Sequence, residues 1–114
     1  MPMSVIDLNI FNSLKDATGA EFTGELIHAF LEDAPLQIQQ MQAALTMQDA
    51  ESFRRAAHTL KSNAATFGAM ELSSLARELE GMGREENLEV GTKLEVMQEA
   101  FEQVKVELKE LINP

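Results

Sequence analysis

The 114-residue sequence contains no cysteine, no tryptophan and no tyrosine, and its six phenylalanines are its only aromatic residues apart from histidine. A chain without cysteine has no disulfide framework and no thiolate metal site. A reducing compartment is the simpler setting for such a chain. We therefore expect a cytoplasmic location.

Basic residues are also scarce. Nine Lys and Arg residues stand against nineteen Asp and Glu residues, which gives a formal net charge of −10 and a pI near 4.5. Nucleic acids and anionic membranes bind basic surfaces, because their phosphates repel an acidic one. The composition argues against nucleic acid and membrane partners and favours a protein partner with a basic rim.

Long apolar runs and nucleotide-binding motifs are missing too. The first residues, Met-Pro-Met-Ser-Val, lack the basic start and the apolar segment of a signal peptide, and we expect no transmembrane span. The patterns G-x-x-x-x-G-K-[ST], G-x-G-x-x-G and G-x-S-x-G do not occur. The chain therefore has no recognisable ATP site, and we do not expect it to act as an autonomous enzyme.

Glycine and proline are few, with six and three residues, and long stretches of strong helix formers lie between them. The sequence predicts a single all-α domain over residues 1–114. Two short N-terminal helices, within about 5–33, would cover one end of an up-down antiparallel four-helix bundle. The helices of the bundle are expected at about 35–46, 50–67, 70–81 and 91–112.

Three residues set the expected boundaries. Pro35 is tolerated in a first helical turn, so it predicts a break between a helix at 20–33 and the next helix. Gly81 and Gly83 would end the helix at 70–81 and open a charged loop.

In the helix at 20–33, the apolar spacing predicts four buried side chains: Phe22, Leu26, Ile27 and Phe30.

Residues 51–69 read Glu-Ser-Phe-Arg-Arg-Ala-Ala-His-Thr-Leu-Lys-Ser-Asn-Ala-Ala-Thr-Phe-Gly-Ala. Asp49 would cap this helix, and its apolar residues form one stripe: Phe53, Ala56, Ala57, Leu60, Ala64 and Phe67. His58 lies on the shoulder of that stripe and faces outward. Three of the nine basic residues of the chain lie within about one helical turn of it. The neighbours at i−4, i−3, i+3 and i+4 are Arg54, Arg55, Lys61 and Ser62.

An exposed helical histidine is most often an ordinary surface residue, and we interpret His28 in that way. For His58 the neighbouring cations indicate an anionic guest. If the guest is a phosphoryl group, the cations would disfavour the imidazolium and keep the ring nucleophilic near neutral pH. They would then attract the attached phosphoryl group. Lys61 is best placed to position the phosphate, while Arg54 and Arg55 would set the field for docking.

Other chemistries lack necessary parts. A metal site needs three or four His, Cys, Asp or Glu ligands, and His58 has cations where ligands should stand. Haem ligation is disfavoured, because the methionines predicted to face the core fit the apolar stripes as gap fillers and no C-x-x-C-H occurs. A structural helical adaptor, in which His58 does no chemistry, remains an alternative.

The stretch His58-Thr-Leu-Lys-Ser-Asn-Ala-Ala-Thr-Phe-Gly-Ala69, preceded by Phe53-Arg-Arg-Ala-Ala57, resembles the histidine-containing phosphotransfer (HPt) domain family of bacterial phosphorelays. The whole chain resembles that family in length and helix order. The resemblance implies that His58 accepts a phosphoryl group from the aspartate of a response-regulator receiver domain and passes it to another receiver. It also implies that Lys61 steadies the phosphate and that Gly68 is the turn residue closing the helix.

Ser62 departs from the family pattern, which commonly has glycine four residues after the histidine so that the receiver can approach closely. Serine is nearly as small, so we expect docking to survive. No cofactor is expected on this domain, because in the family the receiver supplies Mg²⁺ and an acidic pocket. The docking surface would include small or polar residues near the histidine: Gln37, Gln40, Ser62 and Ala65.

The implied partners are response-regulator receiver domains and a sensor or hybrid histidine kinase. An alternative within the same chemistry is the phosphoryl-accepting N-terminal domain of a chemotaxis-type histidine kinase. Such a domain has a very similar stretch around its histidine and receives phosphate from ATP through a separate catalytic domain. We expect a monomer, because the predicted bundle uses up its apolar faces.

Overall fold

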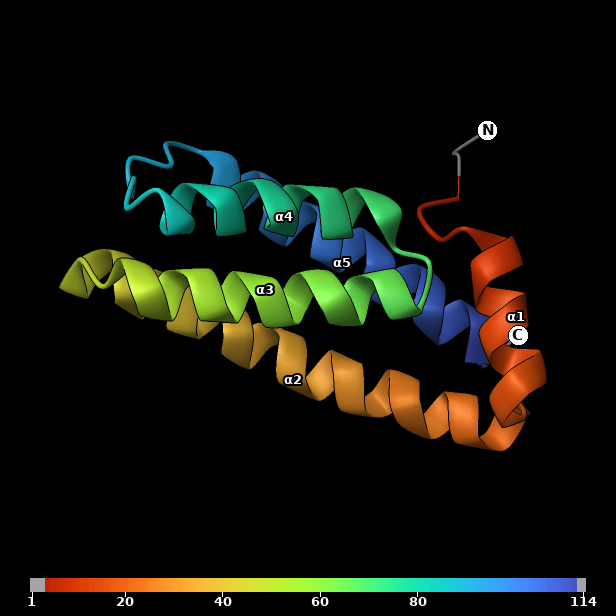
Figure 1. The fold of residues 1–114 in the computed structure, drawn as a ribbon. Coiled ribbons are helices and arrows are strands. Elements are labelled where there is room, and N and C mark those ends of the chain that lie inside the picture. Colours follow the sequence, from red (N-terminus) through yellow and green to blue (C-terminus); the bar gives the residue numbers. More distant parts are fainter. Residues whose placement is uncertain (1–3, 113–114) are drawn as a thin grey trace.

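The computed structural model describes residues 4–112, which form five helices and no strand (Figure 1). From α2 onward the helices lie side by side along the molecule and alternate in direction, while α1 packs across one end (Figure 1). The prediction of an all-α fold is confirmed. The helices are α1 (Leu8–Thr18), α2 (Ala20–Met47), α3 (Ala50–Thr66), α4 (Met70–Arg84) and α5 (Lys93–Ile112).

The helices predicted at 20–33 and 35–46 are one helix, α2, so the predicted break at Pro35 is wrong. Proline has no backbone N–H, and the Leu31 carbonyl therefore loses its helical partner. Both residues line an open surface groove between α2 and α5. The 28 residues of α2 span about 42 Å at 1.5 Å per residue. This matches the 41 Å length of the molecule, and only α1 is a short covering helix.

A continuous α2 carries one buried stripe from end to end. Phe22, which was predicted to be buried, is 49% exposed. The reason is that the stripe continuing past Pro35 passes through Thr23 instead, and Leu26 lies only partly buried beside it. Ile27 and Phe30 are buried as predicted. The full stripe is Thr23, Ile27, Phe30, Ala34, Ile38, Met41 and Ala44.

The core fixes which face of α3 is turned to solvent. The ring of Phe30 on α2 packs against Phe67, just after α3, and against Phe101 on α5, with ring centroids 5.2 and 6.0 Å apart. The predicted apolar stripe of α3, which includes Phe53 and Leu60, is buried. The opposite face of α3 is therefore exposed. No helix within residues 4–112 is both long and apolar enough to cross a membrane.

Local signals define both ends of α3. The side chain of Asp49 accepts a hydrogen bond from the Ser52 backbone N–H at 3.1 Å, which confirms the predicted cap. At the other end Gly68 adopts a φ of +83°, a conformation that glycine takes without strain. A side chain there would also collide with the backbone of Asp7, because an added Cβ would lie 2.7 Å from the Asp7 carbonyl oxygen. Gly68 thus forms a tight turn between α3 and α4.

The helix predicted to end at residue 81 continues to Arg84. Gly81 and Gly83 lie inside α4 and do not open the loop, and α5 begins at Lys93 rather than near residue 91. A glycine inside a helix costs about 1 kcal/mol relative to alanine, and that cost is tolerated here. The extra turn of α4 carries Gly83 and Arg84 alongside α3.

Candidate functional site

His58 lies in the middle of α3, and its side chain is 54% exposed. Its Nδ1 atom is 2.7 Å from Oε2 of Glu80 on α4. The Glu80 side chain, in contrast, is only 3% exposed. One edge of the imidazole ring is therefore held by a buried carboxylate, while more than half of the side chain remains open to solvent.

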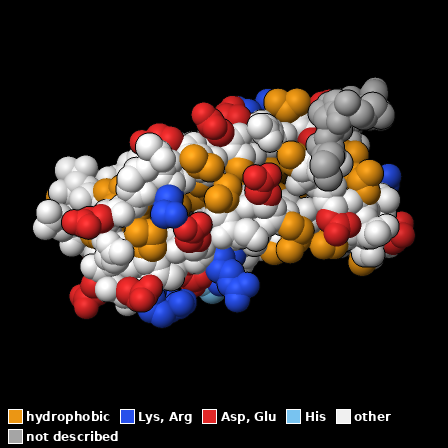
Figure 2. All heavy atoms as spheres, turned by 90° about the horizontal axis from the view of Figure 1, so that it is seen from above, with side chains coloured by type: hydrophobic (Ala, Val, Ile, Leu, Met, Phe, Trp, Pro, Cys, Tyr) orange, Lys and Arg blue, Asp and Glu red, His pale blue; other side chains and the backbone are white. Residues whose placement is uncertain are grey.

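Both oxygens of the Glu80 carboxylate have basic partners. Lys61 Nζ donates to Oε1 at 2.6 Å, and Arg84 Nη2 donates to Oε2 at 3.2 Å. Together, Lys61, Arg84 and ionised Glu80 carry a net charge of +1 beside the ring. This is unusual in so acidic a chain, and Figure 2 shows Lys and Arg side chains gathered beside a histidine at one edge of the molecule.

The ionisation of Glu80 decides which nitrogen of His58 is free. Burial alone would raise the pKa of Glu80, but hydrogen bonds from Lys61 and His58, together with the positive charge of Lys61, hold that pKa below its usual value. An ionised carboxylate can only accept hydrogen bonds, so Nδ1 must carry the proton. In the neutral ring the lone pair then lies on Nε2, so Nε2 is the ring nitrogen with a lone pair free to accept a bond.

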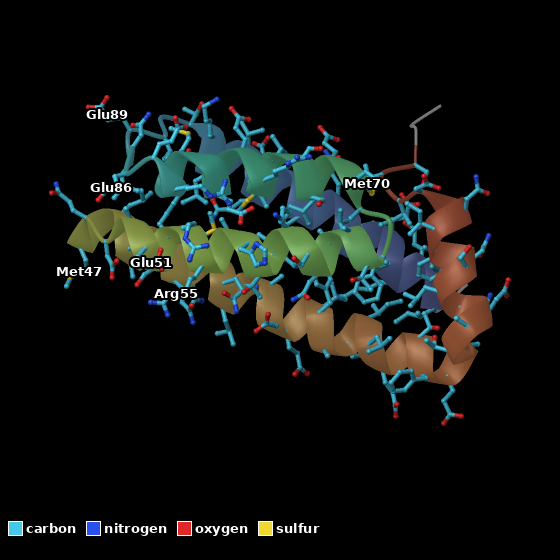
Figure 3. The ribbon with its side chains drawn as sticks, in the orientation of Figure 1. Met47, Glu51, Arg55, Met70, Glu86 and Glu89 are labelled. Carbon is cyan, nitrogen blue, oxygen red and sulfur yellow. The ribbon has the colours of Figure 1, made fainter. Side chains whose placement is uncertain are left out.

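Two of the cations assigned to His58 from the sequence have another partner. Arg54 donates to Glu51 at 2.8 and 3.0 Å, and Arg55 lies 3.8 Å from the same carboxylate. Figure 3 shows Glu51 and Arg55 projecting from the first turns of α3. The spacing of Glu51 to these arginines, i+3 and i+4, is itself a sequence signal for such pairs. The charged group in contact with the ring is Glu80, which the helical spacing around His58 does not indicate.

The profile of the Hpt domain family matches residues 25–113 of this sequence. The chain belongs to the Hpt domain family. Hpt domains take part in two-component phosphorelays as histidine phosphotransfer proteins, together with histidine kinases and response regulators.

Solved structures of Hpt domains share the fold. Histidine-containing phosphotransfer protein B (HptB) from Pseudomonas aeruginosa PAO1 superimposes with a TM-score of 0.91 at 25% identity, covering 98% of this chain and 97% of that one. The HPT domain of an Hpt sensor hybrid histidine kinase from Shewanella gives a TM-score of 0.79 at 14% identity, covering 96% and 95%. Among curated protein sequences none matches this chain.

The remaining residues predicted for the site of this Hpt domain lie on α2 and α3. Ser62, one turn after His58, is exposed, and Ala65 is partly buried. On α2, Gln40 is exposed, whereas Gln37 is partly buried and its amide lies 3.4 Å from both carboxylate oxygens of Asp33. Gln37 is thus less available to a docking partner than Gln40.

The donor set around His58 does not fit a metal ion. Within residues 4–112 no three His, Cys, Asp or Glu side chains are grouped closely enough to hold one. The one carboxylate at the site, Glu80, has both oxygens engaged by Lys61, His58 and Arg84. A metal ion bound at Glu80 would have to displace these partners.

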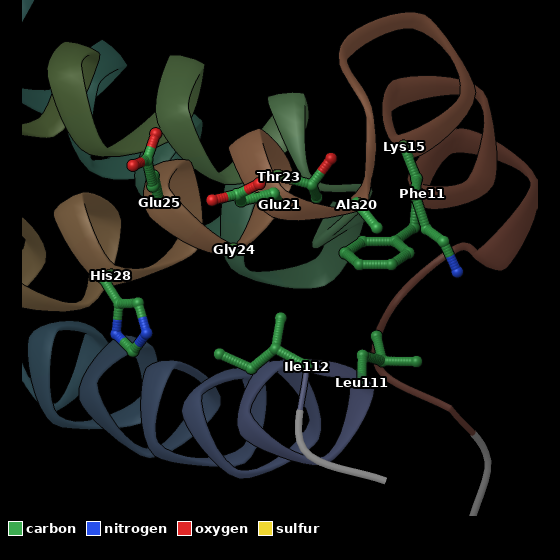
Figure 4. A pocket seen from close by; sticks show the side chains of 10 residues that line it. All are labelled: Phe11, Lys15, Ala20, Glu21, Thr23, Gly24, Glu25, His28, Leu111 and Ile112. Atoms are coloured by element: carbon green, nitrogen blue, oxygen red, sulfur yellow. The ribbon is translucent and has the colours of Figure 1, made fainter.

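The second histidine, His28, lies in a different part of the molecule. It lines a depression between α1, α2 and the C-terminal end of α5, together with Lys15, Glu21 and Glu25 (Figure 4). Nothing there corresponds to the buried carboxylate that holds His58. His28 is exposed, and we interpret it as an ordinary surface residue.

Glu80 and its partner Arg84 are the site residues that were not predicted from the sequence. Glu80 lies 22 positions after His58 on another helix, whereas the spacing within α3 indicates only neighbours on that helix. One signal was available: Glu80 follows the buried residues Ser73 and Ala76 by seven and four positions, which places a carboxylate on the inner side of α4. A charged residue at such a position needs a partner.

Proposed function

We propose that this Hpt domain is a phosphorelay intermediate that carries a phosphoryl group on Nε2 of His58. It would accept the group from the aspartyl phosphate of one receiver domain and pass it to the aspartate of another. The observation that carries this proposal is the contact between His58 Nδ1 and the buried carboxylate of Glu80. The likeness to HptB, described as a histidine-containing phosphotransfer protein, supports it.

The proposed transfer step begins with Nδ1 protonated and Nε2 free, and it forms one bond to phosphorus while it breaks another. The Nε2 lone pair of neutral His58 attacks phosphorus, the Nε2–P bond forms and the bond from phosphorus to the aspartate oxygen breaks. The bonding pair leaves with the aspartate as a carboxylate. Because Nδ1 keeps its proton, the phosphorylated ring becomes an imidazolium, and its positive charge develops next to Glu80. The reverse sequence returns the group to a second receiver.

Glu80 therefore has two effects on the proposed reaction. It holds the tautomer whose nucleophilic nitrogen is Nε2, and it stabilises the charge that the ring gains as the bond forms. The first effect is present before a receiver binds, so it needs no rearrangement.

Lys61 would link Glu80 to the phosphoryl group. An ammonium group has three N–H donors, and the Glu80 contact uses one of them. The others remain available to phosphoryl oxygens. Lys61 thus neutralises Glu80 in the unmodified domain and positions the phosphate in the modified one.

Receivers would dock on the exposed sides of α2 and α3 around His58. Ser62 and Gln40 are exposed there, and Ala65 and Gln37 border them. Their small or polar side chains permit close approach. Arg54 and Arg55, each paired with Glu51, would contribute only a partly neutralised field to docking.

The test is phosphoryl transfer from radiolabelled phosphorylated receivers of the same organism. We expect acid-labile, base-stable label on the wild-type domain and on His28→Gln, and none on His58→Gln, because only His58 has the positioned nucleophile. Folded wild-type protein that takes label from no receiver would contradict the proposal and favour a structural adaptor. Label that persists on His58→Gln would place the chemistry at another residue.

A further inference from the structure

Gly83 lies where α4 comes nearest to the backbone of α3. It is buried, and a Cβ built on it would lie 3.1 Å from the backbone nitrogen, Cα and Cβ of Arg54. Carbon atoms normally meet at 3.5 to 4.0 Å. Two of the three atoms belong to the backbone, so a rotamer change cannot relieve the contact. Any side chain at position 83 must therefore move the two helices apart.

This close approach adjoins the proposed site on both helices. Arg54 precedes His58 by one turn of α3, and Gly83 follows Glu80 by about one turn of α4. On the other side of the His58–Glu80 pair, the Ser73 hydroxyl of α4 donates to the Lys61 carbonyl of α3 at 3.0 Å. The pair thus lies between two points at which α3 and α4 are held together.

We propose that Gly83 is a positioning residue for His58: by having no side chain, it sets the spacing of α3 and α4 that lets Glu80 reach Nδ1. The phosphotransfer consequence rests on the function proposed above, whereas the effect on the ring does not. The sequence gives no hint of this role, because glycine in that region predicts only a loop.

The chain offers a matched control in Gly81. It lies two residues earlier in α4, and a Cβ added there would meet no atom within 4 Å. Alanine is the better helix former at both positions, and neither glycine has a positive φ. Gly81→Ala and Gly83→Ala should therefore both fold, and only Gly83→Ala should change the spacing of the helices.

The experiment measures the imidazole of His58 by ¹⁵N NMR in both variants and the rate of phosphoryl transfer from a phosphorylated receiver. Gly81→Ala should match the wild type. Gly83→Ala should show less of the Nδ1–H tautomer and should transfer roughly three- to tenfold more slowly, since a displacement of about 1 Å can cost 10²-fold and a few tenths of an ångström are expected here.

The outcomes separate this inference from the proposed function. Identical ring spectra and rates for the two variants would overturn the positioning role. If the wild type accepts no phosphoryl group but Gly83→Ala still shifts the tautomer, the relay function fails and the positioning role stands. Slower transfer with an unchanged ring spectrum would contradict it, because the effect would then not pass through the His58–Glu80 contact.

Discussion

Glu80→Gln is expected to slow phosphoryl transfer to and from His58 by roughly 10- to 100-fold, which reaches at most the lower limit of what a positioned acid or base contributes. The amide keeps the size of the side chain but loses its charge. It no longer neutralises the imidazolium that forms on transfer, and its NH₂ group can donate to Nδ1 and favour the wrong tautomer. Single-turnover transfer from a phosphorylated receiver measures the effect.

Glu78→Gln is the matched control for that change. Glu78 also lies on α4 and pairs with Lys93, but it is half exposed and belongs to the opposite side of the helix from the His58 contact. Removing its charge should leave the transfer rate within about twofold, because exposed ion pairs contribute little. Equal rates for the two variants would remove Glu80 from the mechanism.

Because the pKa of Glu80 is lowered, the stability of the wild type and that of Glu80→Gln should depend differently on pH. A carboxyl group whose pKa is lowered by folding stabilises the native state at pH values above its pKa in the unfolded chain, which is about 4.3 for glutamate. That contribution is lost as the pH falls through the pKa of the group in the folded state. Urea unfolding of the wild type should therefore show this loss only below about pH 4.3. Glu80→Gln should lack this component.

Leu60→Ala is expected to lower the free energy of unfolding by about 2 to 5 kcal/mol. Leu60 is fully buried, with 0% exposure, and lies two residues from exposed His58 on the same helix. Truncating it leaves a cavity between α3 and its neighbours. Urea denaturation at neutral pH measures the loss.

A loss below about 0.5 kcal/mol for Leu60→Ala would mean that the buried face of α3 has been assigned wrongly. It would then also be wrong to treat His58 as exposed. The helical spacing of Leu72, Leu75 and Leu79 predicts a buried Leu75, but the structure shows this side chain only partly buried. The same truncation there should cost less than at Leu60.

The sequence predicted well those features that depend on one helix at a time. The buried stripe of α3 follows from the 3.6-residue period, and its start follows from the capping side chain of Asp49. The predicted boundary at Pro35 is wrong because the continuation of α2 depends on packing between helices. The lost hydrogen bond of a proline is a local cost, and packing of one long α2 against α3 and α5 outweighs it.

The site was predicted in part for the same reason. His58 and Lys61 lie on one helix, so helical spacing places them together. Glu80 and Arg84 come from α4, and their approach to His58 depends on the packing of α4 against α3, which periodicity within either helix does not encode. Placing Gly83 in a loop removed the last turn of α4, which carries Arg84 and the close approach of Gly83 to α3. A charge partner from another helix therefore remained hidden.

The most direct test of the account is to identify the phosphorylated nitrogen of His58. The domain, labelled with ¹⁵N-histidine, would be phosphorylated by a receiver and its imidazole nitrogens assigned by ¹⁵N and ³¹P NMR. The account predicts a bond from phosphorus to Nε2, with the proton retained on Nδ1 against Glu80. Phosphorus bound to Nδ1 would contradict it, because that nitrogen would have to leave the carboxylate on which the whole arrangement depends.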